Sequence, residues 1–317
     1  MFVVRRPAGV KVRRDGVETE LAADLVVDAT GRTGRAPVWL AALGYDKAPE
    51  EELPIDLMYA TRHVRHGADV EVDGVTAALI GHYPGMPRAF FVCRVEGGRG
   101  LVMAAGYGAH HPPSDDAGFD AFVASVAPPA TAAAVAGAES LGPVVTHRFP
   151  SNFRRRYEKL DRFPAGFLVF GDAMCSVNPL YGTGMTVCAL QAKELRRCLV
   201  RGGDDLAPRF FKAAAKPVDL AWQSSVGADL ALPEIEGRRN AVIRVLNHYI
   251  ARVHAAAETE PAVAEAFLRV IDFLDPPSRL FAPSVLRRVF RPAASTPARP
   301  TAGADPADAQ LVGVEHF

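Results

Sequence analysis

The chain has 317 residues, 49% of them hydrophobic, which is enough to bury the core of one large domain or two ordinary ones and excludes wholesale disorder. The net charge is zero and the 36 basic residues are scattered, which argues against a nucleic-acid-binding surface. No run of about 18 apolar residues is present, so we predict no membrane-spanning helix. The four cysteines form no CxxC pair and residues 1–20 lack the apolar segment of a signal peptide; we therefore expect a cytoplasmic protein without disulfides or metal.

The first 50 residues predict a hairpin and then a buried strand. Within residues 1–23, Asp15-Gly16 is a turn signal between two alternating runs. Leu25 to Val27 are apolar and mostly β-branched, which is typical of a buried parallel strand, and the strand ends at Asp28. A short helix is predicted within 36–48, with Pro37 near its start and Gly44 at its end.

The next hundred residues change pattern and predict an antiparallel sheet with helices. Glycine-containing turns, among them Asp73-Gly74, separate four strand-like runs, over 55–65, 75–83, 88–95 and 100–107. We then expect helices over 115–127, with Ser114 as N-cap, and 130–140, followed by a strand over 143–149. The basic run Arg154–Arg156 is interpreted as a solvated loop.

A second buried strand is predicted over 167–172, and the chain beyond it is helical. The helix over 184–200 has one apolar face, made of Met185, Cys188, Ala189, Ala192, Leu195 and Leu199. Further helices are expected over 206–230, 234–257, 261–274 and 282–290, and the Pro- and Ala-rich tail 291–317 is expected to be disordered.

The pattern predicts an α/β layer that is interrupted by an antiparallel sheet, an α+β insert, and followed by a helical C-terminal part. The expected parts are residues 1–50, the antiparallel sheet with its helices (51–150), residues 151–203, the C-terminal helices (204–290) and the disordered tail (291–317).

The stretch GDAMCSVNPLYGTGM, residues 171–185, is built like a ligand-binding turn. Asp172 follows a strand at the edge where open α/β sheets bind ligands. Pro179 fixes the turn, and Gly182 and Gly184 let a planar or phosphate group approach the backbone. The helix that follows presents free N–H groups and partial positive charge. A capped strand–turn–helix without a ligand has the same spacing.

This stretch resembles the second FAD-binding motif of the single-component flavin monooxygenases, the para-hydroxybenzoate hydroxylase superfamily. By that resemblance Asp172, after Gly171, binds the ribityl chain of FAD, and Pro179 lies beside the isoalloxazine. The turn Gly182-Thr183-Gly184 leads into a helix whose N–H groups at Met185 and Thr186 face flavin N1 and O2. The segment ADLVVDATGR resembles the family's strand near the pyrophosphate and adenosine, and Asp28, Thr30, Gly31 and Arg32 carry that likeness. The lead-in to Asp172 and the segment near residues 272–290 resemble the hydroxylase and epoxidase branch. The resemblance implies that residues 1–50 and 151–203 form a partial FAD-binding Rossmann-like layer, and that the antiparallel sheet in 51–150 binds the substrate.

The resemblance implies an FAD-dependent monooxygenase that hydroxylates or epoxidises an aromatic or alkene substrate through a flavin C4a-hydroperoxide, with NAD(P)H and molecular oxygen as co-substrates. The flavin carries the chemistry, so no protein side chain is expected to be catalytic. Substrate contacts are expected on the antiparallel sheet, where alternation sends only half of the candidates to one face. These candidates, for which core packing is the alternative, are Tyr59, His82, Tyr83, Phe90 and Phe91.

One family element is missing from the sequence: the GxGxxG motif of the first βαβ unit, where FAD pyrophosphate lies. We therefore expect the chain to represent a truncated enzyme or to need a second chain, or a homodimer, to complete the site. Two alternatives stay open. One is a flavin-dependent reductase or dehydrogenase of isoprenoid-like substrates, and the other is a non-catalytic remnant or half of a split flavoprotein.

Overall fold

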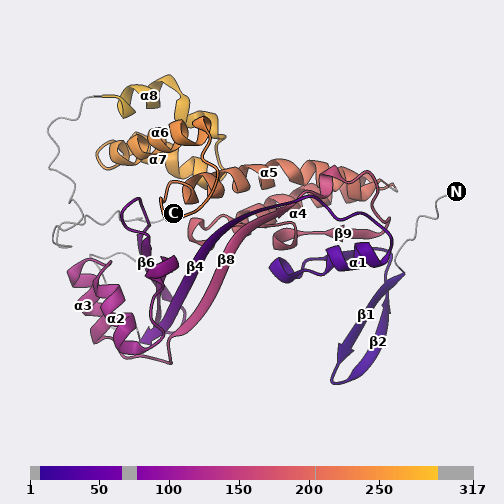
Figure 1. The fold of residues 1–317 in the computed structure, drawn as a ribbon, viewed down its shortest axis with the longest axis horizontal. Helices are drawn as coiled ribbons and strands as arrows, with labels where there is room; N and C mark the ends of the chain where they lie inside the picture. Colours follow the sequence, from indigo (N-terminus) through magenta and orange to yellow (C-terminus); the bar gives the residue numbers. More distant parts are fainter. Residues whose placement is uncertain (1–7, 66–76, 204, 292–317) are drawn as a thin grey trace. The chain divides into compact units, whose positions relative to one another are not determined.

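The computed structural model describes residues 8–65, 77–203 and 205–291 (Figure 1). The chain divides into two compact units. Unit 1 comprises Met1–Leu53, Asn152–Gly227 and Ile271–Phe273; unit 2 comprises Pro54–Ser151, Ala228–Val270 and Leu274–Phe317. The predicted turn at 73–74 and the tail from residue 292 lie outside the described residues. The functional parts assigned from the sequence remain predictions.

Unit 1 begins with the predicted hairpin, which is confirmed. Strands β1 (Gly9–Arg14) and β2 (Val17–Ala22) pair antiparallel with Arg14 opposite Val17. Asp15 and Gly16 both have positive φ, 52° and 79°, as a two-residue type I′ turn requires. Asp-Gly therefore fixes the register of the hairpin.

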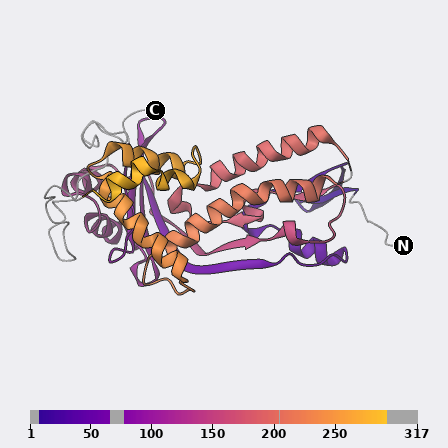
Figure 2. The same ribbon diagram turned by 90° about the horizontal axis from the view of Figure 1, so that it is seen from above.

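A parallel pair forms the centre of unit 1. Strand β3 (Val26–Asp28) pairs with β9 (Phe167–Val169), which confirms the two predicted parallel strands. Helices α1 (Ala36–Ala42), α4 (Gly184–Arg201) and α5 (Leu206–Asp229) accompany the pair, and the two long ones, α4 and α5, are seen from above in Figure 2. The core of the unit includes Leu40, Tyr157, Leu168, Phe210 and Phe211.

Unit 2 contains the predicted antiparallel sheet, with strand order β8-β4-β7-β6-β5. The strands are β4 (Glu50–Arg65), β5 (Ala77–Ile80), β6 (Arg88–Val95), β7 (Arg99–Tyr107) and β8 (Val145–Arg155). Helices α2 (Asp116–Ala124) and α3 (Pro129–Gly137) pack on one face, around Ala60, Phe90, Val102, Phe119 and Val135. Strands β4 and β8 continue into unit 1, where Ser176 of β10 (Cys175–Ser176) pairs with Phe153.

The C-terminal part is helical, as predicted, and has a core of its own. Helices α6 (Ala241–Ala257), α7 (Pro261–Ile271) and α8 (Pro283–Val289) enclose Tyr249, Val253, Val263, Leu280 and Val285. Helix α6 starts at residue 241 instead of 234. The reason is local: the Arg239 guanidinium donates to the carbonyls of Leu230, Leu232 and Ile235 and holds that stretch as turns. None of the helices in the described ranges has the length and apolarity needed to cross a membrane.

Two expectations about helices are corrected and one is confirmed in its main feature. The N-cap of α2 is Asp115, not Ser114, because the Asp115 carboxylate accepts a hydrogen bond from Gly118 N at 2.8 Å. Helix α1 ends at Ala42, and Gly44, predicted at the helix end, adopts φ 78° and turns the chain before residue 48. The predicted apolar face of α4 is not its buried face: Val187, Gln191 and Cys198 are buried, and Met185 and Leu199 are exposed.

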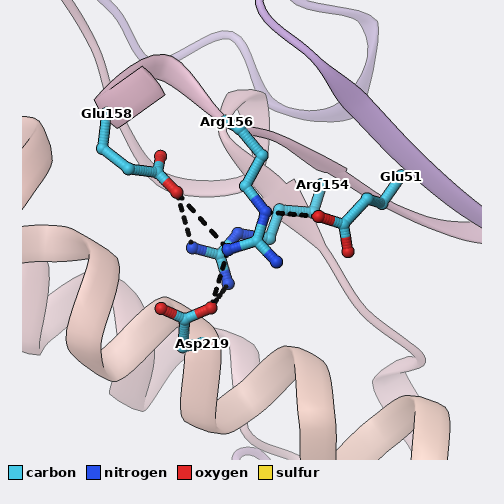
Figure 3. Close-up of polar contacts among 5 residues, drawn as sticks. All are labelled: Glu51, Arg154, Arg156, Glu158 and Asp219. Carbon is cyan, nitrogen blue, oxygen red and sulfur yellow. Dashed lines mark hydrogen bonds and ion pairs between the residues drawn. The ribbon is translucent and has the colours of Figure 1, made fainter.

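The Arg154–Arg156 run is also corrected, because it is no solvated loop. Arg154 is only 1% exposed, and it pairs with Asp219 on α5 and with Glu158 (Figure 3). Arg156 bonds the same two carboxylates and also Glu51 on β4, at 2.5 Å. Burial acts to raise the pKa of Asp219, but the hydrogen bonds from Arg156 and Arg154 outweigh it and the pKa is lowered. The network joins strand and helix segments of unit 1 that are far apart in sequence.

Candidate functional site

Two turns meet at the carboxyl ends of the parallel strands. Asp28 lies opposite Val169, and Phe170 N donates to the Asp28 carbonyl at 2.9 Å. A short 3₁₀ turn follows each strand: η1 (Gly31–Thr33) after β3 and η5 (Gly171–Ala173) after β9. This is the edge where open α/β sheets bind ligands, so the two motifs found in the sequence lie side by side.

The Asp28 loop is closed on itself. The Asp28 carboxylate is buried and accepts hydrogen bonds from Thr30 N at 3.1 Å, Thr30 Oγ1 at 2.5 Å and Ala36 N at 2.8 Å. The last of these contacts satisfies a free N–H at the start of α1. Asp28 thus holds the loop together through bonds within the chain. Gly31 and Arg32, in the turn η1, are the members of the motif that do not take part in these bonds.

The Gly171-Asp172 turn is fixed to helix α4. Gly171 N donates to the buried Gln191 side chain at 2.9 Å. Gly171 has φ 65°, and a side chain there would also press on the Cys188 sulfur at 3.3 Å. Glycine is therefore required at 171, and the N-terminal half of α4 lies beside Asp172.

Asp172 in η5 and Arg32 in η1 interact electrostatically. Burial raises the pKa of Asp172, while a hydrogen bond from Ser176 Oγ at 3.4 Å and the charge of Arg32 act against that rise. Burial also lowers the pKa of Arg32, whose guanidinium lies 4.9 Å from the centre of the Phe153 ring. A half-buried acid and a half-buried base thus border the same edge.

The glycine turn before α4 is open. It begins in the 3₁₀ turn η6 (Pro179–Tyr181), where Pro179 is exposed, and Gly182 then adopts the left-handed conformation with φ 66°. Thr183, the N-cap of the 18-residue helix, makes no side-chain capping bond, and its buried Oγ1 has no hydrogen-bond partner. Side chains built at Gly182 or Gly184 would meet nothing within 4 Å. Met185, followed by the partly buried Thr186, is 86% exposed, so this end of the helix is accessible.

The candidate substrate residues divide between the two faces of the sheet in unit 2. Phe90 belongs to the core under α2 and α3. Tyr59 pairs with Ala105 and Phe91 pairs with Met103. These two partners are two residues apart on β7, so Tyr59 and Phe91 lie on the same face of the sheet, opposite to the face that carries Phe90. Tyr83 is exposed in the turn after β5, where it bridges to Met86. The sequence predicted such a division but could not assign its members.

That opposite face carries a polar cluster that sequence reasoning found only in part. Tyr107, at the end of β7, donates its hydroxyl to the buried Asp229 carboxylate at 3.2 Å and lies 3.4 Å from His82 Nε2. Burial lowers the pKa of His82 to about 4, so the imidazole is neutral near pH 7. His82 was a candidate, whereas Tyr107 and Asp229 are 122 residues apart in sequence and no motif links them.

Comparisons with known proteins give one curated relative and a set of solved structures. The chain is 35% identical over 273 residues to Protein Rv3254 of Mycobacterium tuberculosis, a match that covers 84% of the chain and 57% of the relative. The chain thus spans little more than half the length of that relative. No family model matches the chain.

The structural neighbours have the same fold. They include the flavin-dependent brominase Bmp2 (TM-score 0.52, 16% identity, 82% of this chain and 60% of that one). The flavin-dependent halogenase CmlS is also similar, with a TM-score of 0.53 and 18% identity over 83% of this chain and 52% of that one. The Diels-Alderase PyrE3 of pyrroindomycin biosynthesis has a TM-score of 0.54 and 18% identity over 86% of this chain and 54% of that one. The predicted fold class, α/β with an antiparallel insert and a helical C-terminal part, is confirmed. Identities this low establish the fold alone, and the activity has to be argued from the residues.

Proposed function

We propose that the edge formed by Asp172, Arg32 and the N-terminus of α4 binds FAD, and that the protein acts in an FAD-dependent monooxygenase. The observation that carries the proposal is the open glycine turn. An 18-residue helix begins there without a side-chain cap, beside an unpartnered buried hydroxyl and two glycines with free space. Such an end attracts an electron-rich or anionic group.

The residues fit the parts of FAD. Asp172 is available to accept hydrogen bonds from ribityl hydroxyls, and Arg32 offers a cation for the pyrophosphate side. The exposed Pro179 offers a flat wall for a planar ring. The N–H groups of Met185 and Thr186 would stabilise negative charge on the ring edge. Bound FAD would supply the redox chemistry, with NAD(P)H as reductant and molecular oxygen as oxidant.

We place the substrate, an aromatic or alkene small molecule, on the face of the sheet that carries Tyr59, Phe91 and Tyr107. Aromatic rings supply apolar contact there, and the hydroxyl of Tyr107 and the ring of His82 supply polar atoms. Alternation on the strands excludes Phe90 from this face.

The test is an FAD titration of the purified chain, followed by quenching of flavin fluorescence. Saturable binding is expected, and Asp172→Ala should raise the Kd about tenfold or more, as the loss of a hydrogen-bonding carboxylate does. Asp161→Ala, which removes an exposed acid of the same unit, is the matched control. Absence of binding, or equal loss in both variants, would refute the site.

A second measurement separates monooxygenase from reductase chemistry in a flavin-loaded protein. Oxygen uptake that matches NAD(P)H oxidation and requires the organic substrate supports a monooxygenase. Substrate reduction without oxygen uptake would support a flavin-dependent reductase or dehydrogenase instead.

A further inference from the structure

The glycine turn before α4 rests on an apolar cluster of unit 1. Val177 precedes the turn and is 9% exposed, and Val187 follows it in α4 and is 5% exposed. Both belong to one cluster, which we call the turn base and which consists of Cys175, Val177, Val187, Val218, Ala221 and Trp222. The segment between Val177 and Val187 is thus held at both of its ends by the same packing.

Phe273 packs against the turn base from a distant part of the sequence. It is the last residue of Ile271–Phe273, a short segment of unit 1 at the end of α7. Its side chain is partly buried against the base, as is that of Val226 on α5. The glycine turn is therefore in contact, through its base, with a residue that neither flavin motif contains.

The backbone of Phe273 is strained. Its φ is 60°, in the left-handed region where a bulky side chain crowds its own backbone. At this helix end Leu274 N and Asp275 N both donate to the Arg269 carbonyl, at 2.9 and 3.0 Å. A glycine closes such an end without strain. The side chain is therefore not needed to turn the chain, and what it adds is its contact with the turn base.

We propose that Phe273 is a positioning residue, whose ring supports the turn base and thereby holds the glycine turn in the shape that binds the flavin. The inference rests on the proposed function, because it assigns a role in the same site to a residue outside the motifs. Strained residues persist where the surrounding structure holds them, and they concentrate near ligand-binding elements.

The turn needs such support because it has few bonds of its own. Thr183 makes no capping bond, and Gly182 has φ 66°, a conformation that glycine leaves readily. Rigidity therefore has to come from packing under the turn. A turn that already has its binding shape loses less conformational entropy when the ligand binds, so the support raises affinity.

An FAD titration of variants separates this role from that of a simple helix cap. Phe273→Gly and Phe273→Ala both remove the ring, but only glycine also removes the strain. Both should raise the Kd for FAD about tenfold. The equilibrium constant for unfolding, in contrast, should be about tenfold lower for the glycine variant than for the alanine variant.

Two further variants serve as rescue and control. Phe273→Leu keeps the apolar bulk and the strain, and should bind FAD with a Kd within about threefold of the wild type. Leu274→Ala, at a neighbouring position that is 66% exposed, should change neither affinity nor stability. If Phe273→Gly binds FAD as tightly as the wild type, Phe273 is a helix cap only and the proposal is overturned.

Hydrogen exchange in the flavin-free chain measures the support directly. Gly182 N donates to the Pro179 carbonyl and Val187 N to the Thr183 carbonyl, both at 3.0 Å. These two amides should exchange about fivefold faster in Phe273→Gly and at the wild-type rate in Leu274→Ala. Val26 N, which donates to the Gly166 carbonyl elsewhere in unit 1, is the internal reference and should not change.

The exchange measurement distinguishes failure of this inference from failure of the flavin site. Unchanged exchange in Phe273→Gly would overturn the support of the turn, whatever the FAD titration shows. Faster exchange in a protein whose wild type binds no FAD would bear out the support and refute the flavin site alone.

Discussion

The loop that follows β3 and the glycine turn that precedes α4 differ in whether their polar groups have partners within the chain. The Asp28 loop is closed: one buried carboxylate accepts three hydrogen bonds, including one from the first turn of α1. The Gly182–Gly184 turn is open, because the N-cap Thr183 makes no capping bond and the helix N-terminus is exposed. The first arrangement gives stability to the edge, whereas the second leaves donors for a ligand.

This difference indicates which substitutions should change the free energy of unfolding and which should change ligand affinity. A residue whose partners belong to the chain contributes to the free energy of unfolding. A residue whose partner is a ligand contributes to affinity and can even cost stability while the site is empty. Asp28 is expected to be of the first kind, and Asp172, Thr183 and the glycines of the second.

The largest expected effect is the loss of the closed loop. Asp28→Ala leaves the buried N–H of Ala36 and the donors of Thr30 without an acceptor, which should lower the free energy of unfolding by about 3 kcal/mol. Urea denaturation measures it. Asp46→Ala, an exposed acid of the same unit, should change stability by less than about 0.5 kcal/mol. An Asp28 variant as stable as the control would show that the three contacts do not hold the loop.

The second prediction separates the two glycines of the open turn. Gly182 has φ 66°, so Gly182→Ala should cost about 1 kcal/mol of stability through backbone strain. Gly184 lies in the first turn of α4 without positive φ and with space around it, so Gly184→Ala should be neutral or slightly stabilising. Both methyl groups crowd the approach of a planar ligand, and both variants should lose FAD affinity. Thermal unfolding and flavin titration read out the two effects.

Much of this contrast could be predicted from sequence because its signals are local. Asp15-Gly16 determines its turn, and the strand ending at Asp28 and the glycines at 182 and 184 are recognisable from neighbours alone. The rest depends on contacts between distant segments. Nothing near Arg154 in sequence indicates that Asp219, 65 residues away, neutralises it, so the local pattern indicates a solvated loop where the arginine is buried. The buried face of α4 is not predictable for a similar reason: helical periodicity identifies an apolar face but not the segment that covers it.

The third prediction uses the raised pKa of Asp172. An acid whose pKa is raised in the folded state is protonated in both states below its unfolded pKa of about 4, and there it does not lower the free energy of unfolding. As the pH rises from that value through the folded pKa, ionisation of the buried group lowers the free energy of unfolding increasingly. Asp172→Asn should therefore match the wild type in stability at pH 4 and exceed it at pH 7. The gain should be below about 1 kcal/mol, because solvent screens a half-buried carboxyl. Urea unfolding at both pH values tests this, with Asp161→Asn as control. A gain at pH 4 that disappears at pH 7 would contradict the assigned direction.

The smallest effect on stability is expected at Thr183, where the contrast between the turns is sharpest. Its buried Oγ1 has no hydrogen-bond partner, so Thr183→Val removes a polar atom without breaking a bond and keeps the shape of the side chain. Replacing an unpartnered hydroxyl in this way should leave the free energy of unfolding within about 0.5 kcal/mol of the wild type or raise it. If the hydroxyl is kept for a ligand, FAD affinity should fall in the same variant. A substantial loss of stability would instead mean that Thr183 caps α4 in solution, and the turn would then be closed like that of Asp28.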